Sequence, residues 1–331
     1  MAQIVLAMGT SHGPMLVTPP DLWQLRVLDD VRDMHPWRGR QWSYQELCDA
    51  RRAEELERQI TPEELAARHA RCQRAIERMA DIFSAAHVDL AVIVGNDQME
   101  IYSEDLIPAF GVLWGETIAN TPYSAERLAR LPPGIAESIP GYIPTGGAHY
   151  RGATGLARHL IAQLMASGFD VAAMKGFPNQ ETPHAYGFVY RRIMRDQPVP
   201  SVPVVLNTFY PPNQPNLRRC HDFGLALGDA IARWPADARV ALIASGGLSH
   251  FVIDEDLDRL VLESLVNADI DPLERLGEAV FQSGSSEIKN WLPVSAALRG
   301  RGLKREFVDY VPLYRTAAGT GNAMAFVCWQ P

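Results

Sequence analysis

Short apolar runs that do not alternate with polar residues recur along the chain, and they predict strands that are covered on both faces. They are rich in Val, Ile, Leu and Ala, and the five clearest cover residues 4–8, 90–94, 171–174, 202–206 and 240–244. A strand that is buried on both faces is typical of the central parallel sheet of an α/β protein.

Segments with apolar residues at helical spacing lie between these strands, at residues 62–86, 155–167, 218–234 and 256–267. Thr61 is a suitable N-cap for the first of them, and Glu64 follows three residues later. Strands that alternate with helices predict an α/β fold of three layers. We expect a mostly parallel or mixed central sheet with helices on both faces.

The segment 19–61 differs from the rest of the chain because it is polar and charged but rich in aromatic residues. These are Trp23, Trp37, Trp42 and Tyr44. A segment of this length between a strand and a helix is usually more than a simple connection. Two interpretations fit: a surface excursion that packs its own aromatic side chains, or an insertion that acts as a lid or a dimer contact. We expect one domain over residues 1–331 that carries this insertion.

Composition narrows the class of protein. The chain has 331 residues and a formal net charge of −8, which argues against general binding to nucleic acid or to an anionic membrane surface. The four cysteines are scattered, as suits a reducing compartment, and they are Cys48, Cys72, Cys220 and Cys328. No run of residues has the length or hydropathy of a signal peptide core or a membrane span, so we expect a cytoplasmic protein.

Three of the predicted strands run directly into polar turns. Residues 4–8 are followed by a turn that contains His12, residues 90–94 by one that contains Gln98, and residues 240–244 by one that contains His250. In open α/β sheets, ligands bind beyond the carboxyl ends of the strands. If these strands are parallel neighbours, the three turns meet at one pocket.

Each candidate residue also has a plainer explanation when it is considered alone. His12 suits a structural hydrogen bond within its turn, and His184 suits the start of a helix. Glu287 suits the first turn of a helix capped by Ser285 or Ser286, where a carboxylate complements the helix dipole. His250 is the stronger candidate because the Gly-Gly pair before it allows a ligand to approach the backbone closely. The sequence contains no serine-hydrolase elbow, dinucleotide fingerprint, Walker A motif or H-E-x-x-H motif.

Taken in order, these turns resemble the catalytic subunits of class III extradiol ring-cleavage dioxygenases, a family that includes protocatechuate 4,5-dioxygenase and gallate dioxygenase. The resemblance extends over nearly the whole chain. Its motifs are Thr10-Ser11-His12-Gly13-Pro14, Val94-Gly95-Asn96-Asp97-Gln98, residues 105–110, Gly246-Gly247-Leu248-Ser249-His250 and residues 286–298. Within the family, the chain is most similar to single-chain members that act on gallate or 3-O-methylgallate.

The resemblance implies one non-haem Fe(II) ion held by two histidines and a glutamate, with positions left open for a catecholate and for O2. It assigns His12 and Glu287 as metal ligands. It assigns His250 as the histidine that moves protons during substrate deprotonation and oxygen activation, and His184 as a further catalytic histidine beside the substrate. Thr320 and Asn322 match the region that binds the substrate carboxylate, although a plain turn between strands also explains them.

Gln98 departs from the family pattern, in which a histidine ligand follows the Asn-Asp pair. Three outcomes are open. Gln98 binds the metal directly through its amide oxygen or through water, another histidine (His149 or His69) replaces it, or the site binds metal poorly and has changed its function. We expect Gln98 to be the third metal ligand, because the turn around it is otherwise intact.

The function expected from this resemblance is an Fe(II)-dependent extradiol dioxygenase that opens the ring of a small catecholic acid of the protocatechuate, gallate or 3-O-methylgallate type. Two alternatives remain: a metal-dependent enzyme on the same scaffold with different chemistry, such as a zinc hydrolase, and a protein that only binds aromatic acids. The expected partners are the aromatic acid, O2 and a second copy of the chain in a homodimer. Nucleic acid and membranes are not among them.

Overall fold

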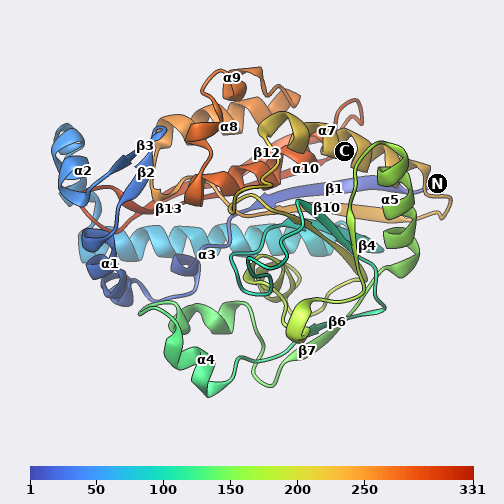
Figure 1. The fold of residues 1–331 in the computed structure, drawn as a ribbon, viewed down its shortest axis with the longest axis horizontal. Coiled ribbons are helices and arrows are strands. Elements are labelled where there is room, and N and C mark those ends of the chain that lie inside the picture. The colour runs from blue at the N-terminus through green and yellow to red at the C-terminus, as the bar shows by residue number, and fades with distance from the viewer.

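The computed structural model describes the whole chain except the side chain of Asn267. Its main sheet follows the order β11-β13-β1-β10-β4-β9-β5-β8, with β12 paired to β13 (Figure 1). Four adjacent strands are parallel: β1 (Gln3–Thr10), β10 (Arg239–Ser245), β4 (Leu90–Gly95) and β9 (Ser201–Leu206). These four strands form the centre of the sheet.

Antiparallel pairs flank this parallel centre on both sides. On one side, β13 (Thr320–Gln330) pairs with β1, β11 (His250–Val252) and β12 (Lys304–Tyr314). On the other side, β5 (Phe110–Leu113) runs antiparallel to β9 and parallel to β8 (Ala172–Met174). The sheet is therefore mixed, and the five strands predicted from the apolar runs are all confirmed.

The four predicted helices are also confirmed, as α3 (Pro62–Ala85), α5 (Thr154–Ala166), α7 (Leu217–Arg233) and α8 (Glu255–Asn267). The Thr61 side chain caps α3 by accepting a hydrogen bond from the backbone N–H of Glu64 at 3.3 Å. The other α-helices are α1 (Val27–Arg32), α2 (Tyr44–Ala50), α4 (Ala125–Arg130), α6 (His184–Phe188), α9 (Asp271–Glu274) and α10 (Trp291–Ala297).

Alternate residues of the central strands enter two separate hydrophobic cores, one on each face of the sheet. On β4, Val92 and Val94 belong to the core that includes residues of α5 and α7, whereas Ile93 belongs to the core that includes residues of α3. Figure 1 shows α3 on one side of the sheet and α7, α8 and α10 on the other. This arrangement is the predicted α/β fold of three layers.

Residues 19–61 form a succession of short elements: the 3-10 helix η2 (Pro20–Arg26), α1, the hairpin of β2 (His35–Trp37) and β3 (Arg40–Trp42), and α2. The rings of Trp37 and Trp42 lie 5.2 Å apart and pack beside Val252 of β11. Part of the segment therefore packs its own aromatic side chains, as one of the two interpretations expected. A second small hairpin joins β6 (Thr117–Asn120) to β7 (Ala148–Arg151).

Among the described helices, none combines the length and the apolar character needed to cross a membrane.

Candidate active site

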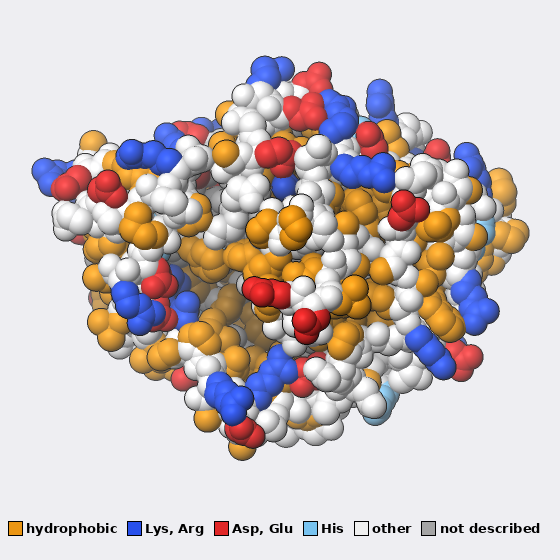
Figure 2. All heavy atoms as spheres, viewed as in Figure 1, with side chains coloured by type: hydrophobic (Ala, Val, Ile, Leu, Met, Phe, Trp, Pro, Cys, Tyr) orange, Lys and Arg blue, Asp and Glu red, His pale blue; other side chains and the backbone are white. Residues whose placement is uncertain are grey.

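The three polar turns meet because β1, β10 and β4 are parallel neighbours. Thr10 of β1 is in register with Ser245 of β10, and Ala244 of β10 is in register with Val94 of β4. His12, Gln98 and His250 consequently line one cavity of about 480 Å³. The face shown in Figure 2 is hollowed near its centre, and hydrophobic side chains surround the hollow. The convergence predicted from the strand pattern is confirmed.

His12 is held in one orientation by Ser245. The Ser245 hydroxyl donates its only proton to the carbonyl of Ala185 at 2.6 Å, so it must accept the hydrogen bond that joins it to His12 Nδ1 at 2.9 Å. The His12 ring therefore carries its proton on Nδ1 when it is neutral. Its other nitrogen, Nε2, is buried and has no hydrogen-bond partner among the described residues. A buried lone pair without a donor is costly in a protein interior unless something binds it.

Glu287 presents its carboxylate to that lone pair, with Oε2 3.4 Å from His12 Nε2. Glu287 is only 1% exposed and accepts hydrogen bonds from Asn96 at 3.1 Å, from the backbone N–H of Gly247 at 2.9 Å and from the Gln98 amide. Burial raises the pKa of Glu287, but the neighbouring histidines together lower it by a larger amount. The net pKa of Glu287 therefore lies well below its ordinary value. The carboxylate is therefore held in its charged form.

The local structure around Glu287 differs from the predicted one. Glu287 lies inside the 3-10 helix η9 (Ser283–Asn290), whose N-cap residue is Gln282, and no side chain caps that helix. The expected caps, Ser285 and Ser286, lie within it. The 3-10 turn directs Glu287 toward the sheet, where three donors hold its carboxylate, so the helix-dipole explanation of Glu287 is wrong.

Two glycines allow η9 to approach the turn after β10. Gly246 has a φ of +140°, and a Cβ there would lie 3.2 Å from Glu287 Oε2 and 2.6 Å from the Asn290 amide nitrogen. A Cβ at Gly284 would lie 1.9 Å from the carbonyl oxygen of His250. Glycine at both positions therefore brings Glu287 and His250 together, with Glu287 Oε2 3.8 Å from His250 Nε2.

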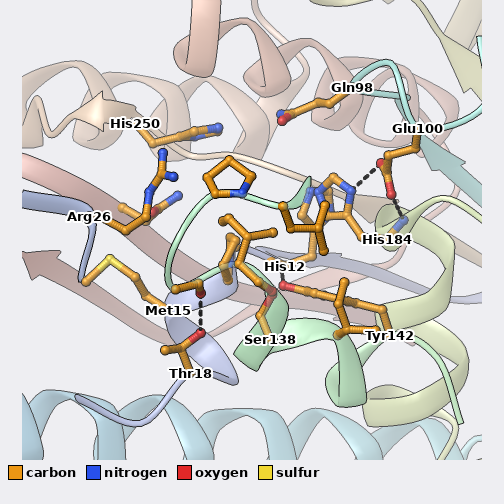
Figure 3. A pocket seen from close by; sticks show the side chains of 18 of the residues that line it. His12, Met15, Thr18, Arg26, Gln98, Glu100, Ser138, Tyr142, His184 and His250 are labelled. Atoms are coloured by element: carbon orange, nitrogen blue, oxygen red, sulfur yellow. Dashed lines mark hydrogen bonds and ion pairs between the residues drawn. The ribbon is translucent and has the colours of Figure 1, made fainter. Parts of the chain in front are cut away.

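His184 begins α6 and lies against His12, with the two rings perpendicular and their centroids 4.4 Å apart. Its Nδ1 is paired with the carboxylate of Glu100, which also accepts the backbone N–H of His184 at 2.9 Å (Figure 3). Burial lowers the pKa of His184, but the Glu100 carboxylate outweighs it and the net pKa rises to about 9. The surroundings of this ring thus favour a positive charge.

Asp97 organises the loop that supplies Glu100. Its carboxylate accepts the backbone N–H groups of Glu100, Ile101 and Tyr102 at 3.1–3.2 Å. Burial, together with the nearby Glu100 charge, raises the pKa of Asp97 to about 7. Asp97 therefore shapes the turn after β4, whose residues Gln98 and Glu100 line the cavity.

His250 is fixed by a backbone carbonyl. Its Nδ1 lies 2.9 Å from the oxygen of Leu248, which can only accept a hydrogen bond, so Nδ1 carries a proton. Its Nε2 is left on the side of the cavity that contains Glu287. A neutral imidazole in this orientation can accept a proton from a molecule bound in the cavity.

The ligand atoms of His12, His184 and Glu287 lie within 4.8 Å of one another. Two imidazole nitrogens and one carboxylate oxygen are the donor set of non-haem Fe(II) oxygenases. His12 and His184 both have their Nδ1 paired with another group, which is how metal-binding histidines are usually oriented. With the partnerless Nε2 of His12 facing the carboxylate, these residues fit a divalent metal ion.

Gln98 lies beside this cluster, and its amide nitrogen donates to Glu287 Oε1. This contact uses the nitrogen end of the amide, whereas a metal would need the oxygen end. The other histidines considered lie elsewhere: His149 is exposed on β7, and His69 of α3 contacts Gln73 and Trp23. Neither His149 nor His69 lines the cavity.

The two residues expected to bind a substrate carboxylate have different surroundings. Asn322 lines the cavity and is paired across the β11–β13 ladder with His250. Thr320 is fully buried outside the cavity lining, and its hydroxyl donates to Asp30 at 2.8 Å. Of the two, Asn322 is therefore the residue placed to contact a molecule bound in the cavity.

The sequence matches the family described as the catalytic LigB subunit of aromatic ring-opening dioxygenase over residues 67–324. The chain belongs to this family. The match covers most of the chain and includes Gln98, His184, His250 and Glu287. It begins after His12 and after the segment 19–61, so it is shorter than the resemblance expected over nearly the whole chain.

Two curated relatives are similar over part of their length. Gallate dioxygenase of Pseudomonas putida is 30% identical over 190 residues, which are 52% of this chain and 52% of the relative. The 2,3-dihydroxyphenylpropionate/2,3-dihydroxicinnamic acid 1,2-dioxygenase of Photorhabdus laumondii is 26% identical over 191 residues, or 57% of this chain and 51% of the relative. The chain thus spans about half the length of the curated relatives it matches.

A solved structure titled as an uncharacterized protein, JW3007 from Escherichia coli K12, is 12% identical and aligns over 98% of this chain and 99% of its own, with a TM-score of 0.46. At that level of similarity it adds nothing to the family assignment.

Several residues of the site were not singled out from the sequence. They are Glu100, Tyr142, Ser245 and Arg26. Ser245 stands at the end of a predicted strand, which was a usable signal because such positions face the crevice. Tyr142, whose hydroxyl donates to the carbonyl of His12 at 2.9 Å, comes from a loop without any motif.

Proposed function

We propose that the chain is a dioxygenase that opens the ring of a catecholic acid and depends on a single Fe(II) ion. The observation that carries this proposal is the buried Nε2 of His12, which has no hydrogen-bond partner within the described part of the chain and lies 3.4 Å from the Glu287 carboxylate. Membership in a family of aromatic ring-opening dioxygenases supports the reaction class. The names of the two curated relatives support a phenolic acid as the substrate.

His12, His184 and Glu287 are the residues that would hold the metal. This assignment differs from the sequence-based expectation at one position, because His184 supplies the second imidazole and Gln98 supports the glutamate. His184 is favoured over Gln98 by its place in the cluster and by its pairing with Glu100. Fe(II) bound there would bring the catecholate and O2 together and polarise both.

His250 is the group suited to take a proton from the substrate. Its Nδ1 is committed to the Leu248 carbonyl, so its Nε2 is the nitrogen available to a hydroxyl of a bound catechol. A neutral imidazole can accept a proton at this nitrogen and later return it. Gln98 and Asn96 donate to Oε1 of Glu287 and keep the carboxylate turned toward His12.

Apolar side chains form part of the cavity wall. Leu22, Trp23, Ile135, Ile139 and Ile143 line the cavity beside the polar residues. Two of these, Leu22 and Trp23, belong to the segment 19–61. We include in the proposal that this segment covers the site as a lid, and that the chain functions as a homodimer in the cytoplasm.

The assignment can be tested with anaerobic Fe(II) titration of four proteins: wild type, His184→Ala, His184→Ala combined with Gln98→His, and His149→Ala as a control on the surface. Loss of a residue that only orients a metal ligand weakens metal binding by roughly 10- to 100-fold. If His184 is itself a ligand, we expect His184→Ala to weaken iron binding by more than this. The double variant should regain part of the affinity, because position 98 faces the same carboxylate. The His149→Ala variant should bind iron as the wild type does.

Oxygen uptake by the iron-loaded wild type is then measured with protocatechuate, gallate and 3-O-methylgallate. Consumption of O2 and new absorbance from a ring-opened product would support the proposal. Iron binding without O2 uptake for any catechol would overturn the reaction and favour a different metal-dependent activity. Absence of metal binding together with tight binding of aromatic acids would favour a binding protein.

A further inference from the structure

Three arginines line the cavity: Arg26, Arg127 and Arg315. Arg315 is neutralised by Asp30 through two hydrogen bonds of 2.7 Å, and both side chains are less than 10% exposed. Arg127 is paired with Glu181 and also donates to the backbone carbonyl of Glu100 at 3.0 Å. These two guanidinium groups therefore already have anionic or carbonyl partners.

Arg26 is less fully paired. Its Nη1 lies 3.1 Å from Asp29 Oδ2, but the contact lacks hydrogen-bond geometry, and this buried nitrogen has no hydrogen-bond partner among the described residues. Asp29 is shared, because its other oxygen accepts a hydrogen bond from Arg32 at 2.8 Å. The Asp29 carboxylate is thus divided between two guanidinium groups, and Nη1 of Arg26 keeps a donor that no described residue accepts.

The surroundings of Arg26 make an anion favourable there. Burial, followed by the nearby charge of Arg315, lowers the pKa of Arg26 from its ordinary value. A guanidinium has five donors arranged as a rigid fork, which matches the two oxygens of a carboxylate. A bound carboxylate would satisfy the free donor and offset the repulsion between the two arginines.

Arg26 is also placed to act on a molecule at the proposed metal centre. Arg26 and His250 both line the cavity, and in Figure 3 they lie on one side of His12 while His184 and Glu100 lie on the other. Asn322, which pairs across the ladder with His250, lines the same part of the cavity. A substrate whose hydroxyls lie at His12 and Glu287 would extend its remaining substituent past His250 toward Arg26.

We propose that Arg26 is the substrate-binding residue that recognises the carboxylate of the aromatic acid, and that the segment 19–61 thereby makes the site selective for anionic catechols. This inference rests on the proposed function for the identity of the ring. Asp30 of the same segment supports the arrangement, because its buried pair with Arg315 ties the segment to the hairpin of β12 and β13. Thr320 braces that pair by donating to Asp30.

The test is equilibrium binding to Fe(II)-loaded protein without oxygen, so that no turnover is needed. The ligands are protocatechuate, gallate and 3-(2,3-dihydroxyphenyl)propionate, each compared with its neutral amide. We expect Arg26→Gln to weaken binding of at least one acid by about 10- to 100-fold, as for a hydrogen bond to a charged group, and to change binding of its amide by less than about twofold. Arg26→Lys, which keeps the charge but loses the fork, should fall between wild type and Arg26→Gln.

Arg32→Gln is the matched control, because Arg32 also pairs with Asp29 but is largely exposed. It should bind every ligand as the wild type does, and the iron content and thermal denaturation of all variants should agree. Three results would each overturn the role of Arg26. Arg26→Gln could weaken binding of acid and amide equally, it could leave binding of the acids unchanged, or the wild type could bind none of the acids. The two proposals fail separately. If binding is selective for the acids and depends on Arg26, but no O2 is consumed, only the ring-opening reaction is refuted.

Discussion

Ser245 Oγ lies 2.9 Å from Nδ1 of His12 and donates its own hydrogen bond to the carbonyl of Ala185. The serine thereby determines which nitrogen of the imidazole is free. Because Ser245 ends β10 and His12 follows β1, this contact exists only when the two strands are paired in parallel. The register of the sheet therefore sets the tautomer of His12, a buried residue proposed to bind the metal.

Replacing Ser245 with alanine removes the acceptor for His12 Nδ1–H. The unpaired buried donor should lower the free energy of unfolding by about 1–3 kcal/mol. Iron affinity should fall by about 10- to 100-fold, because the ring is no longer oriented. Anaerobic iron titration and chemical denaturation measure the two effects.

Ser295→Ala is the control for this change. Ser295 is a buried serine of α10 whose hydroxyl donates to the carbonyl of Leu265 at 2.9 Å, away from the cavity. The Ser295→Ala variant should have a lower free energy of unfolding than the wild type but the same iron affinity. Wild-type iron affinity in Ser245→Ala would show that Ser245 does not orient His12.

Replacing His250 with phenylalanine keeps a ring of similar size but removes the proton acceptor. Since His250 is not one of the residues proposed to bind iron, the iron content should remain at the wild-type level. The rate of oxygen uptake should fall by about 100- to 10,000-fold, the usual contribution of a general base. Near-normal turnover would exclude His250 from proton transfer, and loss of iron would make it a ligand.

Asp258 of α8 supports the turn that carries His250, because it accepts the backbone N–H and the hydroxyl of Ser249 at 2.8 and 2.7 Å. Burial raises its pKa in the folded protein from the ordinary 3.8 to about 7. Between these two pH values the folded state holds more protons than the unfolded state, so stability must fall as the pH rises. We expect the free energy of unfolding to decrease from about pH 4 to about pH 7 relative to Asp258→Asn, which mimics the protonated acid.

Denaturation curves across this pH range measure the difference between the two proteins. Asp256→Asn removes an exposed carboxylate from the same helix and should keep the wild-type pH dependence. A difference between wild type and Asp258→Asn that does not vary with pH would refute the prediction.

The sequence by itself determined five strands of the main sheet, among them its parallel centre, and the convergence of their turns. Apolar runs without alternation identify strands that are covered on both faces, and helical spacing identifies what covers them. Since parallel strands expose their carboxyl ends at one edge, the turns with His12, Gln98 and His250 had to meet there if the strands were neighbours. The motifs at these turns also sufficed to indicate the family, which the comparison confirms over residues 67–324.

Only the tertiary structure decided which side chains at that edge face one another. Gln98 precedes Glu287 by 189 residues, and it is the contact between them that shows the amide nitrogen turned toward the carboxylate. His184 comes from a short helix without a distinctive pattern, and Arg26 comes from a segment whose composition left open both a surface excursion and a lid or dimer contact. Periodicity reports which face of an element is buried, whereas the partner of a polar side chain depends on packing between elements that are distant in the chain.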